Sequence, residues 1–184
     1  MPDYHLFGGV IRSALDFPEL VPATAESPRW WFVQRATPHL HASLAPLGTE
    51  QVDAGVTVTL YRAGPVLRLV FDDTGIFDVS SDGRKIFWTP PAIPNMEAVR
   101  KDVLGRVFAV ALDQEGIITL HGSAVALGGE AVVFLAPKFH GKSTTATALV
   151  NAGGRLLADD LVPVTPGSDP MVLPSVPMVQ GQIT

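Results

Sequence analysis

The first half of the chain alternates between apolar and polar residues, a pattern that predicts β-strands with one buried face. Four segments show this alternation: residues 4–13, 30–36, 56–73 and 75–88. Gly64-Pro65 divides the third segment and Asp82-Gly83 the fourth. Both dipeptides favour turns, so each of these two segments is predicted to form a β-hairpin. The prolines of residues 89–94 cannot donate to a β-ladder and are expected to end the β-rich region.

A different periodicity begins after Asn95. Apolar residues then recur every four positions or so, at Met96, Val99, Val103, Val107 and Ala111. This spacing predicts a helix that packs one apolar face against a core. Asn95 is suited to cap the start of this helix, and Gly116 is suited to end it.

Strands and a helix alternate in the second half of the chain. Predicted strands at 117–127 and 131–136 are followed by a helix over about 142–152 and by a further strand at 155–164. This order is that of a βαβ unit, so the strand 155–164 is expected to run beside 131–136. The segment 131–136 is wholly apolar, which predicts a strand buried on both faces.

The composition is that of a folded globular protein, and it limits the chemistry. Of 184 residues, 47% are hydrophobic and 17% are charged, and the apolar runs are too short to span a membrane. The absence of cysteine excludes disulfides and thiolate metal sites, and a net charge of −5 argues against nucleic-acid binding. The first residues, MPDYHLFGG, lack the pattern of a secretory signal. A cytoplasmic protein that binds neither nucleic acid nor membrane is predicted.

A candidate phosphate-binding loop precedes the helix 142–152. The residues Gly141, Lys142, Ser143 and Thr144 match the second half of the motif G-x-x-x-x-G-K-[ST], whereas Ala136 occupies the position of its first glycine. Such a loop directs backbone N–H groups at an anion from the start of a helix, whose dipole also favours negative charge. The alternative interpretation is an ordinary helix start that binds no ligand.

The side chains of this loop suit a polyphosphate. Lys142 is predicted to reach the β- and γ-phosphates of a nucleotide, and Ser143 to bind Mg²⁺ through its hydroxyl group. Lys138 and His140 place two further potential cations nearby.

Two neighbouring carboxylates, Asp159 and Asp160, lie in the predicted strand 155–164. At the edge of an α/β sheet, a carboxylate can bind Mg²⁺ or accept a proton from an attacking hydroxyl group. Successive side chains of a regular strand face opposite ways, so both aspartates can enter one site only if the strand ends there. The alternative is a solvated turn.

Histidines offer weaker candidates. His121 lies in a predicted strand next to Gly122, which allows another backbone to pass closely, but a single histidine is more often structural. His39 and His41 would share one face of a strand and could chelate a metal, although a plain surface strand is the favoured interpretation.

Three segments together resemble the C-terminal catalytic domain of HPr kinase/phosphorylase: LHGSAV (120–125), FLAPKFHGKSTTATAL (134–149) and RLLADDLV (155–162). That family has a His-Gly strand, a P-loop and an Asp-Asp pair in this order. The segments 4–20 and 102–125 also resemble HPr-kinase-like proteins of bacterial peptide-biosynthesis clusters. Some members of that wider group phosphorylate a serine of a lasso-type precursor peptide.

The resemblance implies a fold and a domain organisation. It predicts an α/β protein, α+β overall, in which a β-rich region (1–94) and a connecting helix (95–116) precede a P-loop nucleotide-binding domain (117–184). That domain is expected to resemble the phosphoenolpyruvate carboxykinase-like fold. Kinases of the family continue beyond the aspartate strand, which leaves two interpretations open: a fragment of such a domain or a natural short form of it.

The resemblance also implies the roles of single residues. The GKST residues would hold the phosphates of ATP, with Ser143 and Asp160 binding Mg²⁺. Asp159 would be the base that takes the proton from a substrate serine, and His121 would lie against the transferring phosphate.

The predicted function is therefore that of an ATP-binding, Mg²⁺-dependent serine kinase whose partner is a protein or peptide bearing a serine. Two alternatives remain open: a nucleotide-binding regulatory module without phosphotransfer activity, and an inert scaffold. A homo-oligomer is compatible with either function.

Overall fold

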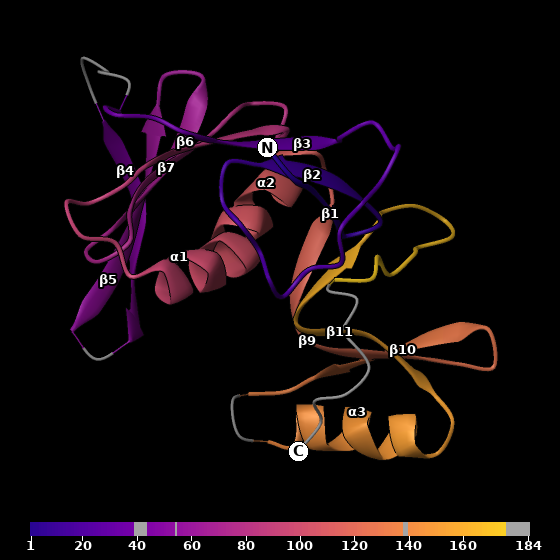
Figure 1. The fold of residues 1–184 in the computed structure, drawn as a ribbon. Helices are drawn as coiled ribbons and strands as arrows, with labels where there is room; N and C mark the ends of the chain where they lie inside the picture. The colour runs from indigo at the N-terminus through magenta and orange to yellow at the C-terminus, as the bar shows by residue number, and fades with distance from the viewer. Residues whose placement is uncertain (39–43, 54, 138–139, 176–184) are drawn as a thin grey trace.

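The computed structural model describes residues 1–38, 44–53, 55–137 and 140–175 of the chain. These residues form an eight-stranded mixed sheet, here called the larger sheet, and a three-stranded antiparallel smaller sheet (Figure 1). The larger sheet contains β1 (Asp3–Leu6), β2 (Gly9–Ser13), β3 (Trp30–Gln34), β4 (Ala45–Asp53), β5 (Val56–Ala63), β6 (Val66–Phe71), β7 (Gly75–Val79) and β8 (Lys85–Thr89), in the order β1-β2-β3-β8-β7-β6-β5-β4. The smaller sheet contains β9 (Ile118–Leu127), β10 (Glu130–Leu135) and β11 (Arg155–Val164), in the order β10-β9-β11.

Both hairpins predicted from the alternating pattern are confirmed. β5 pairs antiparallel with β6 across Gly64-Pro65, and β7 pairs antiparallel with β8 across the turn that contains Gly83. Gly64 and Gly83 have φ values of 63° and 71°, a backbone conformation that glycine adopts without steric cost. The strand β4 was not predicted from the sequence. The parallel pairing of β3 with β2 on one side and with β8 on the other was not predicted either.

The predicted helix is present as three consecutive helical segments: α1 (Met96–Asp102), the π-helical η1 (Val103–Val107) and α2 (Phe108–Gln114). The side chain of Asn95 accepts hydrogen bonds from the N–H groups of Glu97 and Ala98, which confirms it as the N-cap. The π-helical turn was outside the prediction, because the apolar spacing does not distinguish it from a regular α-helix. In the described parts of the chain, no helix has the length and apolar character needed to cross a membrane.

The main hydrophobic core lies between the larger sheet and these helical segments (Figure 1). Large aromatic side chains from three strands and α2 occupy its centre, each at most 2% exposed: Trp30, Phe32, Phe77, Trp88 and Phe108. The Trp30 and Phe108 rings meet edge to face at 5.5 Å, and the Phe77 and Trp88 rings stack at 6.4 Å between centroids. The apolar stripe of the helix therefore faces the sheet, as its periodicity predicts.

The prediction of an α/β fold with a P-loop domain like that of phosphoenolpyruvate carboxykinase is wrong. The described residues form mainly β-strands, and α3 (Lys142–Asn151) is the helix between β10 and β11. The turn at Gly128-Gly129, with φ values of 61° and 90°, returns β10 antiparallel along one edge of β9, and β11 pairs with the other edge. β9 therefore separates the two strands that a βαβ unit would place side by side.

β10 is an edge strand, so the prediction that it is buried on both faces is also wrong. Val132 is 39% exposed and Leu135 is 58% exposed. α3 packs against β9 and β11 (Figure 1). Ala146 is the only buried residue of this helix. The apolar composition of β10 therefore did not predict its burial correctly.

The two sheets contact each other through β9, β11 and the segment that follows β11. Ile117, immediately before β9, belongs to the main core, and Leu161 of β11 packs against it. The main chain of Ser175 accepts a hydrogen bond from Phe7 N at 3.3 Å and donates one to Leu157 O at 2.9 Å. The structure does not test the predicted domain boundaries at residues 94 and 116, which stay predictions.

Candidate functional site

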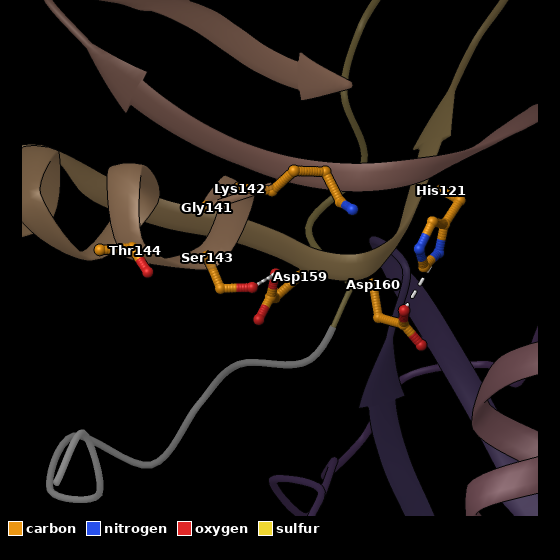
Figure 2. Close-up of a pocket in the computed structure, with 7 residues that line it drawn as sticks. All are labelled: His121, Gly141, Lys142, Ser143, Thr144, Asp159 and Asp160. Carbon is orange, nitrogen blue, oxygen red and sulfur yellow. Dashed lines mark hydrogen bonds and ion pairs between the residues drawn. The ribbon is translucent and has the colours of Figure 1, made fainter. Parts of the chain in front are cut away.

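A cavity of about 470 Å³ lies where the start of α3 faces β9 and β11 (Figure 2). Its lining residues come from all three sequence motifs: His121, Gly141, Lys142, Ser143, Thr144, Asp159 and Asp160. This volume is within the range of small-molecule pockets. The fold thus brings together seven of the eight predicted site residues, although it differs from the predicted domain.

The remaining candidates are not part of this lining. His140 is exposed and is not among the lining residues, and its main-chain N–H donates to Pro137 O at 3.3 Å. Lys138, His39 and His41 lie outside the described residues.

The start of α3 has the backbone geometry of an anion site. Gly141 is the N-cap, with φ of 80°, and the first helical bond runs from Thr145 N to its carbonyl oxygen at 2.8 Å. The N–H groups of residues 142–144 belong to the first turn, where a helix offers no acceptor four residues earlier. A Cβ atom at Gly141 would meet nothing within 4 Å, so its positive φ, not crowding, is what requires glycine. These N–H groups and the helix dipole favour an anion at this end of the cavity.

Lys142 folds back over the segment that precedes the helix. Its Nζ donates to the carbonyl oxygens of Ala136 at 2.7 Å and Pro137 at 3.2 Å. The ammonium group is therefore held between the end of β10 and the helix start. A phosphate oxygen bound there can replace either carbonyl as acceptor.

Asp159 is the centre of a hydrogen-bonded group that we call the Asp159 cluster, consisting of Ser123, Ser143 and Asp159. Its Oδ1 accepts from Ser143 Oγ at 3.1 Å and from Ser123 Oγ at 2.5 Å. Figure 2 shows Ser143 and Asp159 pointing toward each other. The predicted Mg²⁺-binding hydroxyl group and a carboxylate thus lie in direct contact.

Ser123 is the site residue that the sequence analysis missed. It is fully buried in β9 and lies directly opposite Asp159 in the register with β11. A signal was available: Ser123 is a polar residue in an apolar strand, two positions after His121 and therefore on the same face of a regular strand.

Asp160 shows why both aspartates line the cavity although β11 continues to Val164. The prediction that this requires the strand to end is wrong, because Asp160 has φ of 72° and the regular alternation of side chains is broken there. Its Oδ1 lies 3.1 Å from His121 Nδ1, and Figure 2 shows the two side chains facing each other. His121 and Asp160 side chains are 61% and 81% exposed, so this pair forms the open side of the cavity.

Gly122 permits the close spacing of β9 and β10 beside the cavity. A Cβ atom at Gly122 would lie 2.6 Å from Phe134 O and 2.8 Å from Leu135 Cδ2. The expectation that this glycine lets backbone pass closely is therefore confirmed. In the strand register, Gly122 lies between Leu135 of β10 and Asp160 of β11. It therefore sets the spacing between the strand that leads to the helix start and the strand that carries the aspartates.

The site suits a divalent cation only together with phosphate. Among the described residues, no group of three or more His, Cys, Asp or Glu side chains could hold a metal ion by itself. Mg²⁺ in nucleotide sites, however, is usually held by one or two protein oxygens with phosphate and water completing its shell. Ser143 Oγ and the Asp159 carboxylate provide two such oxygens beside the helix start.

Comparisons of the chain with protein-family models, curated protein sequences and solved structures found no match. The resemblance to HPr kinase/phosphorylase therefore stays a prediction.

Proposed function

We propose that the cavity binds Mg²⁺–ATP and that the protein transfers the γ-phosphate to a serine of a protein or peptide. The observation that supports this most directly is the 3.1 Å contact between Ser143, in the first turn of α3, and Asp159 of β11. It brings the start of a helix, which favours anions, and a carboxylate, which suits Mg²⁺, to one end of the same cavity.

Nucleotide phosphates would bind at the start of α3. The N–H groups of its first turn would donate to phosphate oxygens, and Lys142 would exchange its contacts with Ala136 O and Pro137 O for a phosphate. When bound, Mg²⁺ neutralises charge on the β- and γ-phosphates. Ser143 and Asp159 are the residues that would hold it.

The geometry favours a division of roles between the two aspartates that differs from the one implied by the resemblance. Asp159 contacts Ser143, which favours a role in binding the metal, whereas Asp160 contacts His121 at the open side, where an acceptor can approach. In the transfer step, the serine oxygen bonds to the γ-phosphorus and the bond to the β–γ bridging oxygen breaks. ADP leaves with the electron pair of that bond, and the hydroxyl proton passes to the His121–Asp160 pair.

Nucleotide binding without phosphotransfer is a second candidate function, and the exposure of the His121–Asp160 pair favours it. The described residues leave this side of the cavity open to solvent, with 61% and 81% of the two side chains exposed. Phosphoryl transfer generally uses a site from which water is excluded, because water competes with the acceptor.

Calorimetric titration with ATP, with and without Mg²⁺, tests the binding site. Lys142→Ala should weaken binding by about 10- to 100-fold, because one or two charge-assisted hydrogen bonds are lost. Lys101→Ala is the matched control, since Lys101 is an exposed lysine of α1. Equal ATP affinity in Lys142→Ala and the wild type would remove the assignment.

Incubation with γ-labelled ATP and serine peptides separates the two functions. A kinase should label the peptide, and Asp160→Asn should reduce the rate by about 100-fold or more while ATP binding persists. Asp159→Asn should instead weaken the Mg²⁺-dependent part of ATP binding. Tight Mg²⁺–ATP binding with no labelling of any serine peptide would favour the binding module.

A further inference from the structure

We infer that Ser123 is a positioning residue that orients the Asp159 carboxylate for the metal of a bound nucleotide. The inference rests on the proposed function, and it extends the site into the buried layer beneath the cavity. Ser123 is not among the residues that line the cavity, so it would act through its hydrogen bond to Asp159.

The contact between Ser123 and Asp159 is short, and its donor is buried whereas the Asp159 side chain is exposed to the cavity. Ser123 is 0% exposed, and its Oγ donates to Asp159 Oδ1 at 2.5 Å. A buried hydroxyl group needs a hydrogen-bond partner, and Asp159 supplies it. Because β9 is the central strand of the smaller sheet, this donor has a fixed position.

Two donors from different elements converge on one oxygen of Asp159. Ser123 approaches Oδ1 from β9, and Ser143 approaches it from the start of α3. Together they restrict rotation of the carboxylate about its terminal torsion, which is otherwise broad. Neither contact uses Oδ2, which is a further oxygen that a cation bound next to Ser143 can take.

The residues around Ser123 are small and buried, so an apolar residue would be expected at this position. Ala124 and Ala158 beside it are buried and small, and the preceding Gly122 is buried against β10. A serine in such a strand needs an acceptor, and the Asp159 carboxylate supplies it. Through this hydrogen bond, the pairing of β9 with β11 fixes the orientation of the carboxylate that would bind the metal.

The expected effect follows from the role of residues that hydrogen-bond to a metal ligand and hold it in the binding orientation. Loss of a residue that orients a ligand typically weakens metal affinity by about 10- to 100-fold. Ser123→Ala should therefore reduce the Mg²⁺-dependent increase in ATP affinity by about that factor. ATP affinity measured in excess chelator should change little, because the helix start and Lys142 remain intact. A merely structural role would weaken binding under both conditions alike.

The experiment is calorimetric titration of ATP into wild type, Ser123→Ala, Ser123→Thr and Ser123→Cys, each with Mg²⁺ and with chelator. Ser123→Thr keeps the hydroxyl group and should retain most of the Mg²⁺ effect. Ser123→Cys has the same shape with a somewhat larger atom in place of the hydroxyl oxygen, and its thiol is only a weak donor. It should therefore lose the Mg²⁺ effect, which keeps the test available if Ser123→Ala fails to fold. Ser13→Ala is the matched control: Ser13 of β2 is also 0% exposed, its hydroxyl group accepts from Leu15 N, and it is not among the residues that line the cavity.

Two results would overturn the inference in distinguishable ways. If the wild type binds ATP with a clear Mg²⁺ effect and Ser123→Ala and Ser123→Cys keep it in full, the role of Ser123 is wrong and the proposed function stands. If the wild type itself shows no Mg²⁺-dependent ATP binding, the proposed function is wrong and the role of Ser123 is lost with it.

Discussion

Asp160 lines the cavity and has a left-handed backbone conformation. A φ of 72° is uncommon for a residue other than glycine, and it turns the second carboxylate of the pair toward His121 within a continuous strand. Unusual backbone of this kind is often retained where it serves a site. The proposed division of roles between the two aspartates depends on this single torsion angle.

The backbone cost of Asp160 can be measured apart from its chemistry. Asp160→Gly removes the carboxylate and relieves the left-handed backbone, whereas Asp160→Ala removes the carboxylate and keeps the strain. We expect Asp160→Gly to be more stable than Asp160→Ala by about 1 kcal/mol in urea unfolding. Equal stability of the two variants would mean that the left-handed conformation is absent or imposes no cost.

A second residue-scale prediction concerns Asp102, which lies at the end of α1 and accepts a hydrogen bond from Thr74 Oγ1 at 2.7 Å. Burial raises the pKa of Asp102 above its usual 3.8, and the nearby Asp73 charge adds to this, against the opposing hydrogen bond from Thr74. The folded state therefore binds the proton more tightly, and the contribution of Asp102 to stability falls as pH rises above about 3.8.

Asp102→Asn keeps an acceptor for Thr74 and removes this titration. The melting temperature of the variant relative to the wild type should rise between pH 3.5 and pH 7, which differential scanning calorimetry at several pH values can follow. Hydrogen bonds with Thr57 lower the pKa of Asp72, so that carboxylate loses its stabilising contribution as pH falls. Its effect is common to both proteins and cancels in the difference. A constant difference across this range would contradict the raised pKa of Asp102.

At the scale of elements, local signals predicted well what local structure determines. Gly64-Pro65 and Asp82-Gly83 fixed two hairpins, and Asn95 fixed the start of a helix, because turn and cap chemistry acts over a few residues. The partner of each strand was not encoded locally. Nothing in the apolar run of β10 distinguishes an exposed edge strand from a buried central one, and β9 took the central place.

The candidate site was predictable to a similar extent. The GKST residues identify a helix start from sequence, and the three motifs do meet at one cavity. Their order along the chain could not show that Asp159 would lie opposite Ser123, because this depends on the β9–β11 register and on its irregularity between Leu156 and Ala158. The fold that the motifs suggested was wrong, although residues of all three motifs line one cavity.

The turn between β7 and β8 gives an element-scale prediction, because it packs against α2. Gly83 has φ of 71°, and a Cβ atom there would lie 2.1 Å from Ala111 O in the middle of α2. Gly116 has a similar φ of 76°, but a Cβ atom there would meet nothing within 4 Å. Gly116→Ala should therefore cost only the backbone term, about 1 kcal/mol.

Gly83→Ala should cost this term and an overlap with helix backbone, so we expect a further loss of about 1–3 kcal/mol. Chemical denaturation of both variants measures the two values. Similar losses for Gly83→Ala and Gly116→Ala would show that the turn can move away from α2 freely, and that the hairpin and the helix are not tightly packed.

At the scale of the whole molecule, the two sheets have very different cores. The larger sheet and its helices enclose the aromatic centre around Trp30 and Phe108. Among the described residues, the hydrophobic cluster of the smaller sheet has four buried members: Ala124, Leu157, Ala158 and Val162. The candidate site thus lies on the less buried part of the structure. Regions with few buried apolar contacts open at lower free energy than the main core.

Hydrogen exchange can test this consequence and connect it to function. Without ligand, main-chain amides of α3 and β10 should exchange faster than those of β7 and β8, because α3 buries only Ala146 and β10 is an exposed edge.

Mg²⁺–ATP should slow exchange at the start of α3 and in β11 around Asp159, since phosphate and metal contacts join these two elements. In Lys142→Ala this slowing should be weaker, while exchange in the larger sheet stays unchanged. Uniform exchange across both sheets, or slowing by Mg²⁺–ATP confined to the larger sheet, would contradict the location of the site, because a ligand stabilises most the segments that it contacts.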